Sequence, residues 1–526
     1  MSFFENLEKN INAENSLGYT ENGALGFTTT GKTILDMNFR VPKYRTAPER
    51  DIAYDFNQAH YENPTLALLW LFYARDCRGG LGERRLFRTI LKDRCQRNAK
   101  EMKPLLKLVP EYGRWDDLIY ATDCTELWDT TISLIREQLD KDLSDMSANK
   151  PVSLLAKWLP SSNTSSADTK KLAMKIARGL GMQVNQYRKT LSKLRAYIKV
   201  VEVQMSANEW SDIDYSAVPS YANLRYKNAF MKHDEARRQE YLDSLVNGET
   251  KINASVAFPH DIVHKYSDHS YWSQHIGDYD ETLEQMWKAL PTATDLANTI
   301  VVADGSGSMT SNVGGTNVTA LDVANALAIY CAERNSGEFH NKYITFSENP
   351  KFVDLSPADS LRDKLEIAYR HNECANTNIE AVFDMILDTA VQTHAKQDEI
   401  PANILIISDM EFDNCVCTNR PCRSYNGDRK SVNDTLFEQI RQKYADAGYK
   451  LPRLVFWNVC SRTSVIPVKE NELGVALVSG FSTSILNMVM SGELDPLECL
   501  INILMVERYK PVRDAIASMI ASMTEQ

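Results

Sequence analysis

The sequence predicts a chain of two parts: an α-helical repeat domain over residues 1–290 and a doubly wound, Rossmann-like α/β domain over residues 291–526. Two observations predict this division. The first part shows apolar side chains at helical spacing with little strand signal, whereas the second alternates apolar β-branched runs with helical runs. A length of 526 residues is sufficient for two domains with separate cores.

The first part is expected to consist of successive helices joined by short polar turns. Their expected ranges are 66–72, 86–91, 103–109, 125–143, 152–159, 166–179, 183–205, 223–228, 235–245 and 279–290. Helices of this length in succession are typical of stacked HEAT-like pairs, although no strict sequence period is visible.

Three glycines separate the first two of these helices, in Arg78-Gly-Gly-Leu-Gly-Glu-Arg-Arg-Leu-Phe-Arg88. Backbone N–H groups beside glycines can hold a phosphate at the start of a helix. No Gly-Lys-Ser/Thr follows, so the segment is not a Walker loop. A corner between two helices with a solvated basic face is the favoured interpretation.

Residues 151–200 carry ten basic side chains and a single acid, Asp168. The basic residues of the two helices expected here are Lys170, Lys171, Lys175, Arg178, Arg188, Lys189, Lys193, Arg195 and Lys199. Tyr187 and Tyr197 lie among them, and cations beside aromatic rings can hold phosphates and stack unpaired bases. A solvated amphipathic helix with half-buried tyrosines explains the pattern equally well, so both hypotheses stay open.

The second part alternates strands and helices. Expected strands cover 300–302, 343–346, 404–407, 454–459 and 476–479, and expected helices cover 321–334, 361–371, 379–394, 434–447, 484–491 and 496–523. This alternation predicts a mainly parallel sheet covered on both faces.

Oxygen-bearing side chains follow the first of these strands. Asp304, Ser306 and Ser308 are separated by glycines, which allow a tight turn in which alternate side chains converge. A carboxylate and two hydroxyls are hard ligands suited to Mg²⁺, and the carboxyl end of a strand is where open α/β sheets bind their ligands.

This stretch resembles the metal-ion-dependent adhesion site (MIDAS) of von Willebrand factor A domains, whose first motif is Asp-x-Ser-x-Ser. The resemblance implies a Thr in a later loop and an Asp after another buried strand, and Thr377 and Asp409 match these positions in order. It further implies bound Mg²⁺ or Mn²⁺ and a partner protein that presents an acidic side chain. A site that only holds loops together is the alternative.

The first part resembles the TROVE module of Ro autoantigen-type RNA-binding proteins, and more closely a TROVE-like branch that also ends in a von Willebrand A domain. The motifs behind this resemblance are Glu21-Asn-Gly-Ala-Leu, Arg78-Gly-Gly-Leu-Gly-Glu-Arg, Tyr112-Gly-Arg-Trp-Asp-Asp-Leu and Tyr187-Arg-Lys-Thr-Leu-Ser-Lys-Leu-Arg. The resemblance implies helical repeats bent into a ring that binds structured or misfolded RNA, as part of a ribonucleoprotein.

The net charge of −11 lies entirely in residues 291–526, which contain 20 basic and 31 acidic side chains. No run of apolar residues is long enough for a membrane span, and the first residues lack the basic start and apolar core of a secretory signal. Ten scattered cysteines are typical of reduced thiols, so we expect a cytoplasmic protein. We also expect a monomer with no membrane partner. Cys415, Cys417 and Cys422 are expected to be free thiols; the alternative is a zinc site completed by Cys374 or another residue.

The sequence therefore predicts an RNA-binding scaffold with a divalent-metal adhesion site for an acidic group. The alternative is a metal-dependent protein–protein adhesion scaffold, cellular or viral, with no RNA role. We expect no enzymatic activity, because no nucleophile elbow, His-Glu-x-x-His, kinase or P-loop signature is present.

Overall fold

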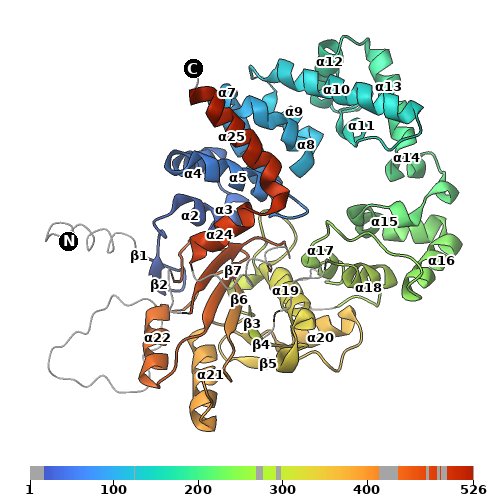
Figure 1. The fold of residues 1–526 in the computed structure, drawn as a ribbon. Coiled ribbons are helices and arrows are strands. Elements are labelled where there is room, and N and C mark those ends of the chain that lie inside the picture. Colours follow the sequence, from blue (N-terminus) through green and yellow to red (C-terminus); the bar gives the residue numbers. More distant parts are fainter. Residues whose placement is uncertain are drawn as a thin grey trace. The chain divides into compact units, whose positions relative to one another are not determined.

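The computed structural model describes residues 17–123, 125–267, 276–291, 296, 298–413, 436–468, 473–482, 486 and 495–524. The chain divides into two compact units (Figure 1). The sheet unit consists of residues 1–51, 55–62 and 257–504, and the helical unit consists of residues 52–54, 63–256 and 505–526. The expected combination of helical and α/β parts is confirmed at this level.

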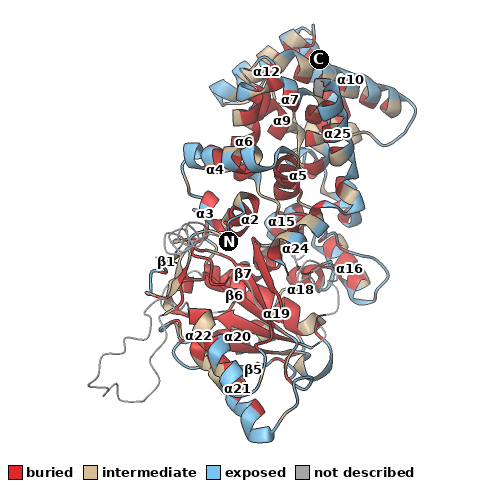
Figure 2. Ribbon diagram, turned by 60° about the vertical axis from the view of Figure 1, so that its left-hand side comes forward, coloured by how far each residue is buried: buried red, intermediate tan, exposed pale blue. Residues whose placement is uncertain are grey.

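The sheet unit is built on six strands in the order β5-β4-β3-β6-β7-β8. The strands are β3 (Thr299–Asp304), β4 (Lys342–Phe346), β5 (Lys351–Asp354), β6 (Asn403–Ser408), β7 (Arg453–Asn458) and β8 (Val475–Ser479). All neighbours are parallel except the β4–β5 pair, which is antiparallel. All residues of β3, β7 and β8 are buried, as expected for a parallel sheet covered on both faces (Figure 2).

Helices alternate with these strands. They are α17 (Pro259–Val263), α18 (Glu281–Lys288), α19 (Ala320–Arg334), α20 (Leu361–His371), α21 (Glu380–Thr393), α22 (Leu436–Asp446) and α24 (Pro496–Leu504). The start of α19 is fixed by a capping box, in which the Thr319 hydroxyl accepts from the Asp322 N–H and the Asp322 carboxylate accepts from the Thr319 N–H. The strands expected at 300–302, 343–346, 404–407, 454–459 and 476–479 are confirmed, whereas the short edge strand β5 was not expected.

The N-terminal segment belongs to the sheet unit, so the predicted boundary at residue 290 is wrong. Strands β1 (Leu17–Tyr19) and β2 (Leu25–Phe27) form a hairpin, followed by α2 (Thr33–Phe39) and α3 (Val41–Tyr44). Phe27 pairs with Ile466 through two backbone hydrogen bonds, and the Asn458 side chain donates to the carbonyl of Phe39 at 2.8 Å. These contacts join residues that are more than 400 positions apart, which local periodicity does not encode. Residues 257–290 join the same unit.

The helical unit follows α4 (Glu49–Glu62), which supplies residues to both units. Its helices are α5 (Pro64–Arg75), α6 (Arg84–Arg97), α7 (Ala99–Met102), α8 (Val109–Tyr112), α9 (Trp115–Thr122), α10 (Trp128–Ser147), α11 (Leu155–Trp158), α12 (Ala167–Gly179), α13 (Val184–Tyr197), α14 (Val201–Ser206), α15 (Ser220–His233), α16 (Glu235–Val246) and α25 (Lys510–Thr524). Consecutive helices pack on one another, as α5 on α6, α12 on α13 and α15 on α16. A closed ring of HEAT-like repeats stays a prediction.

The glycine-rich corner after α5 is a structural turn. Backbone N–H groups of Gly80 and Gly82 donate to the carbonyl of Asp76, both at 3.1 Å, and Leu81 donates to that of Tyr73. A Cβ at Gly80 would lie 2.0 Å from the Tyr73 oxygen, so only glycine permits this close approach. These N–H groups are committed to carbonyls at the end of α5, which favours the interpretation as a corner over phosphate binding.

The C-terminal tail is divided between the units rather than forming one helix over 496–523. α24 lies in the sheet unit, whereas α25 packs on α5 in the helical unit. Just before α25, Arg508 forms an ion pair with the buried carboxylate of Asp76, with Nη2 at 2.6 Å from Oδ1. The Tyr509 hydroxyl donates to the same carboxylate at 3.1 Å.

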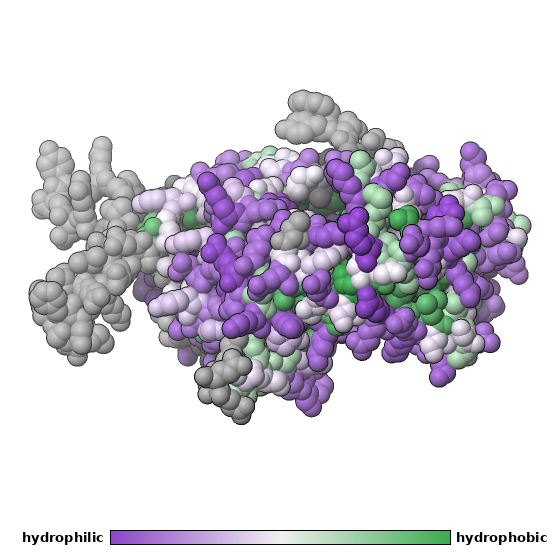
Figure 3. Space-filling model, turned by 90° about the horizontal axis from the view of Figure 1, so that it is seen from above, coloured by the Kyte–Doolittle hydropathy of each residue, from purple (hydrophilic) through white to green (hydrophobic). Residues whose placement is uncertain are grey.

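Hydrophilic residues predominate on the face drawn in Figure 3, with hydrophobic ones between them. Among the described residues, none of the helices has the length and apolar character that a membrane crossing requires.

We expect Arg508→Ala to destabilise the helical unit, because it leaves the buried Asp76 carboxylate without its cation. The loss should be about 2–3 kcal/mol, below the range for a fully buried pair because Arg508 is partly exposed. Chemical denaturation followed by circular dichroism measures it. Lys510→Ala is the matched control, since Lys510 pairs only with exposed Glu507; equal losses in the two variants would contradict the prediction.

Candidate metal centre

The candidate site begins where β3 ends. Asp304 is the last residue of the strand, and the 3₁₀ helix Gly307–Thr310 follows after two residues. The backbone N–H of Ser306 donates to Asp304 Oδ1 at 2.9 Å, so the chain folds back over the carboxylate. The hydroxyl oxygens of Ser306 and Ser308 lie 3.1 Å apart. The three side chains therefore converge, as the glycine spacing predicts.

Two glycines allow this loop to pack against the loop that carries Thr377. A Cβ at Gly305 would lie 2.9 Å from both the Thr345 hydroxyl and the Asn372 side-chain oxygen, and a Cβ at Gly307 would lie 3.1 Å from the carbonyl of Cys374. The bare backbone instead makes two hydrogen bonds, from Cys374 N–H to the Gly305 carbonyl and from Gly307 N–H to the Ala375 carbonyl, each at 2.9 Å. This pairing brings the loop of the buried Thr377 to the end of β3.

The pairing of β6 with β3 positions Asp409 beside Asp304. β6 lies parallel to β3 with Ala303 opposite Ile407, so Ser408 and Asp409 follow beside Asp304. The Ser408 hydroxyl donates to Asp304 Oδ2 at 2.6 Å. The structure thus places Asp304, Ser306, Ser308 and Asp409 at the carboxyl ends of the adjacent strands β3 and β6, with the loop of Thr377 beside them. The strands that follow β3 in sequence, β4 and β5, lie on one side of it, and β6, β7 and β8 lie on the other. Open α/β sheets bind their ligands at such a point of reversal.

The charged forms of the Asp304 and Asp409 carboxylates are disfavoured by burial and by neighbouring carboxylates. Asp304 and Asp409 are 1% and 0% exposed. Burial raises the pKa of Asp304 to about 6, with a further contribution from Asp413. Burial and the nearby Asp304 raise the pKa of Asp409 to about 7, while the Ser308 hydroxyl partly opposes this. A divalent cation at this position would neutralise the repulsion.

The donor set fits Mg²⁺ or Mn²⁺ rather than zinc. Two carboxylates and three hydroxyls are all hard oxygen donors. No cluster of three or more His, Cys, Asp and Glu side chains gathers in the described part of the chain. Burial, followed by Asp304, raises the pKa of the Cys374 thiol, which disfavours the thiolate that zinc requires. Cys415, Cys417 and Cys422 lie outside the described residues, so their predicted state as free thiols stays a prediction.

Four further residues lie at the site or bind a residue that contacts it, and spacing along the sequence did not identify them. Arg462 Nη2 lies 3.4 Å from Asp409 Oδ2. The Asn22 side chain donates to the Thr377 hydroxyl at 3.2 Å and to the Glu411 carbonyl at 2.6 Å. Glu21 forms an ion pair with Arg462 at 2.8 Å. Asn22 and Thr377 are 355 positions apart, and the only sequence signal was the Glu21–Leu25 motif of the family resemblance.

The predicted basic residues lie on α12 and α13, except Lys199, which follows α13, and they divide into two groups. Seven are exposed: Lys170, Lys171, Arg178, Arg188, Lys189, Lys193 and Lys199. Beneath them, apolar side chains of both helices join one core, which includes Ala173, Ile176, Leu191 and Leu194. The amphipathic pattern is thus confirmed, with the cations on the outer side.

Lys175 and Arg195 are only partly exposed and bind groups of the helical unit itself, which argues against their prediction as RNA contacts. Lys175 pairs with Asp123, and its amine lies 4.0 Å from the ring centroid of Trp128. Arg195 donates to the carbonyls of Ala156 at 2.8 Å and Leu159 at 2.7 Å, and burial lowers its pKa. These donors are occupied by the turn before α12, so they are not available to a phosphate.

Tyr187 is buried as well, with 0% exposure, and its hydroxyl donates to the carbonyl of Pro160 at 3.0 Å. The Tyr197 hydroxyl donates to the carbonyl of Lys150 at 2.9 Å. Tyr187 therefore cannot stack a base, which leaves the partly exposed Tyr197 as the available one of the two tyrosines among these cations.

A cleft in the helical unit does combine cations with aromatic rings. It has a volume of about 930 Å³ and is lined by Arg78, Lys107, Arg114, Lys141 and Lys157, by Trp115, Trp158 and Tyr221, and by Glu111, Glu137 and Glu202. The Arg114 guanidinium lies 4.3 Å from the ring centroid of Trp158. Sequence reasoning missed this cleft because its lining comes from segments between residues 77 and 256.

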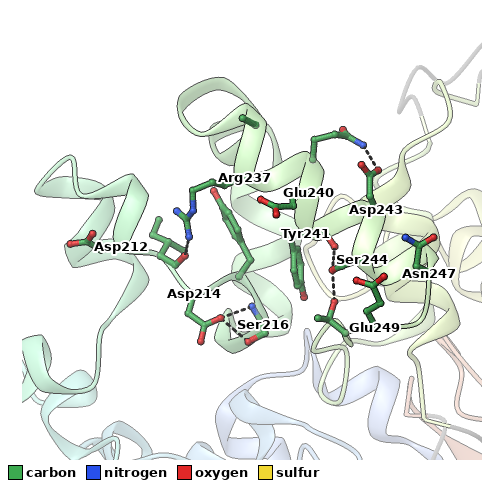
Figure 4. Close-up of a pocket in the computed structure, with 15 residues that line it drawn as sticks. Asp212, Asp214, Ser216, Arg237, Glu240, Tyr241, Asp243, Ser244, Asn247 and Glu249 are labelled. Atoms are coloured by element: carbon green, nitrogen blue, oxygen red, sulfur yellow. Dashed lines mark hydrogen bonds between the residues drawn. The ribbon is translucent and has the colours of Figure 1, made fainter.

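A second cleft of about 930 Å³ is unsuited to a polyanion. Carboxylates of Asp212, Asp214, Glu240, Asp243 and Glu249 line it (Figure 4). Its one cation, Arg237, is held by Asp234 and by the carbonyl of Ile213, each at 2.8 Å. The acidic lining repels phosphate, so this surface does not extend the basic one.

Comparisons with known proteins match both parts of the chain. Residues 298–508 match a domain of unknown function, DUF7788, and residues 181–293 match another, DUF2828. The first match contains all five candidate metal ligands. The uncharacterized protein L728 of Acanthamoeba polyphaga mimivirus is 29% identical over 94% of this chain and 89% of its own length. The crystal structure of the Ro (RSR) protein of Deinococcus radiodurans aligns with 81% of this chain and 91% of that chain, at 13% identity and a TM-score of 0.40.

The raised pKa values predict a pH dependence of the metal-free protein. A carboxyl whose pKa is higher in the folded than in the unfolded chain stabilises the fold below about pH 4, and this contribution is lost as the pH rises to about 7. With a chelator present, the melting temperature of the sheet unit should therefore fall between pH 5 and pH 8. Asp304→Asn should flatten that fall, whereas the exposed Asp354→Asn should not. A wild-type profile without such a fall would refute the prediction.

Proposed function

We propose that this chain is a binding scaffold whose sheet unit holds a divalent cation and, through it, an acidic group of a partner protein. The observation that carries the proposal is the convergence of two buried carboxylates and three hydroxyls at the carboxyl ends of β3 and β6. Asp304, Ser306, Ser308, Thr377 and Asp409 are the residues that would hold Mg²⁺ or Mn²⁺.

The coordination chemistry of the cation explains how such a site could bind an acidic group of a partner. Mg²⁺ requires six oxygen ligands in an octahedron and releases its waters reluctantly. Five protein groups leave at least one position for water or an outside oxygen. When bound, the ion supplies a positive charge for a carboxylate. The protein groups fix the ion's position, and burial excludes competing water from the other ligands.

Metal binding is tested by titrating Mn²⁺ and Mg²⁺ into the full chain. We expect the melting temperature of the wild type to rise with metal, because binding to the folded state alone stabilises it by about 2.7 kcal/mol at a hundredfold excess over Kd. Ser306→Ala and Thr377→Val each remove one hydroxyl ligand and should lower the affinity at least tenfold.

Ser356→Ala is the control, because Ser356 is exposed and lies outside the site. It should leave the metal response unchanged. Equal stabilisation of the wild type and of Ser306→Ala would show that these side chains do not bind metal, and would favour the alternative that they only hold loops together.

The helical unit has a second proposed role, the binding of RNA. Six exposed cations on α12 and α13, and Lys199 just after α13, share a fifty-residue segment with a single acid, Asp168. Inert surfaces normally mix both signs, so this excess favours a polyanionic partner. The cleft that contains Trp158 offers aromatic faces for unpaired bases. The six cysteines that the structure describes are reduced thiols outside any disulfide, which suits a reducing, cytoplasmic compartment.

RNA binding is tested with Lys189→Glu/Lys193→Glu and a mixed-sequence single-stranded RNA. Both lysines are exposed, so the double variant should fold normally and bind more weakly. Each lost phosphate contact should reduce the log–log slope of affinity against salt by about 0.7. Fluorescence anisotropy across a range of salt concentrations measures both quantities.

Arg225→Glu/Lys232→Glu on α15 is a control with the same change of charge on exposed side chains of the same unit. It should retain most of the affinity. Arg195→Glu should instead lower stability, because that guanidinium supports the turn before α12. If the α13 variant binds like the wild type, the rival function applies: a metal-dependent protein adhesion scaffold without an RNA role.

A further inference from the structure

The turn between β1 and β2 lies against the candidate metal site. Thr20 Oγ1 donates to the carbonyl of Phe412 at 2.6 Å, and the backbone N–H of Glu21 donates to Glu411 Oε2 at 2.9 Å. The Asn22 side chain reaches Thr377, one of the proposed ligands, at 3.2 Å. Two hydrogen bonds therefore hold the N-terminal turn on the loop that follows Asp409, and a third joins it to the loop of Thr377.

Arg462 connects this turn to the site itself. Its Nη2 atom lies 2.8 Å from Glu21 Oε2 and 3.4 Å from Asp409 Oδ2. Its Nη1 atom donates to the Ser311 hydroxyl at 3.1 Å, on the loop that carries Ser306 and Ser308. One guanidinium thus bridges a proposed metal ligand and a carboxylate from the N-terminal turn.

The fully buried Glu411 fixes the backbone of Arg462. Glu411 Oε1 accepts from the backbone N–H groups of Arg462 and Thr463, both at 2.9 Å. Glu411 Oε2 accepts from Glu21 N–H. The same carboxylate therefore positions both members of the Glu21–Arg462 pair, although the Glu21 carboxylate itself is about half exposed, at 48%.

We propose that Glu21 is an internal acidic occupant of the open face of the metal site, and that Arg462 is the residue that selects a carboxylate there. The inference rests on the proposed metal function and names the regulation of the same site. A carboxylate on the open face meets two positive groups, the metal and the Arg462 guanidinium. Glu21 already pairs with that guanidinium, so a partner's acidic side chain must replace it.

Tethering makes Glu21 an effective competitor. A group held on the same chain acts at an effective concentration in the millimolar range, so a weakly bound carboxylate from solution is excluded. A partner protein displaces Glu21 only if it adds contacts beyond one carboxylate. The N-terminal turn thereby restricts the site to partners with an extended complementary surface.

The test uses the full chain loaded with Mn²⁺ and acetate as the carboxylate probe. Water-proton relaxation by the bound Mn²⁺ reports both metal binding and displacement of its waters by acetate. Removal of the internal carboxylate in Glu21→Gln should tighten acetate binding about tenfold, because the tethered competitor is lost. Adding Arg462→Gln to that variant should return acetate binding to the wild-type level or weaker.

Glu338→Gln is the control, because Glu338 is an exposed glutamate of the same unit that makes no side-chain contact with the site. Glu21→Asp, which retains the charge on a shorter side chain, should lie between the wild type and Glu21→Gln. The melting temperature of each variant establishes that it is folded.

The outcomes separate the two hypotheses. If Mn²⁺ does not bind to the wild type, the proposed metal function fails and this inference fails with it. If Mn²⁺ binds to every variant but acetate binds equally well to the wild type, Glu21→Gln and the double variant, the metal function stands. Glu21 and Arg462 are then merely structural and the inference is overturned.

Discussion

Two buried carboxylates at the ends of adjacent parallel strands are the constraint on which the sheet unit depends. Because β3 and β6 are in parallel register, Asp304 and Asp409 cannot move apart without breaking the centre of the sheet. Their repulsion must be relieved by protons, by hydroxyl donors or by cations. The structure shows a hydroxyl donor and a cation in these roles. Ser408, at the end of β6, donates to Asp304, and Arg462 approaches Asp409.

This constraint also explains why distant segments meet here. Gly305 and Gly307 allow the β3 loop to touch residues 374 and 375, which brings Thr377 to the site. Glu411 lies just beyond Asp409 and organises residues 461–463 together with the N-terminal turn. Each of these loops makes hydrogen bonds to another loop. The site is therefore preorganised by the sheet and by pairwise contacts between its loops.

The sequence alone predicted the strands and the convergence of Asp304, Ser306 and Ser308 because both depend on local patterns. β-branched runs identify buried strands, and alternating oxygen side chains separated by glycine converge within one turn. Arg462 and Asn22 were missed because they contact the site across separations of 53 and 355 positions, which no periodicity records. Arg195 was predicted wrongly because a charge pattern cannot distinguish a guanidinium that faces water from one that supports a neighbouring turn.

The charge distribution gives the two proposed binding surfaces opposite tasks. Residues 291–526, which contribute most of the sheet unit, carry a net charge of −11, so an acidic partner is repelled over distances of about a Debye length, roughly 8 Å at physiological salt. In the proposed function, attraction there has to come from short-range charges, the proposed metal ion and Arg462, which act only on a carboxylate placed at the site. On α12 and α13 the net charge is positive. A polyanion would therefore be attracted before contact and without one required orientation. Under the proposed function, the sheet unit thus selects a ligand at one point, whereas the basic helices attract a polyanion over a broad surface.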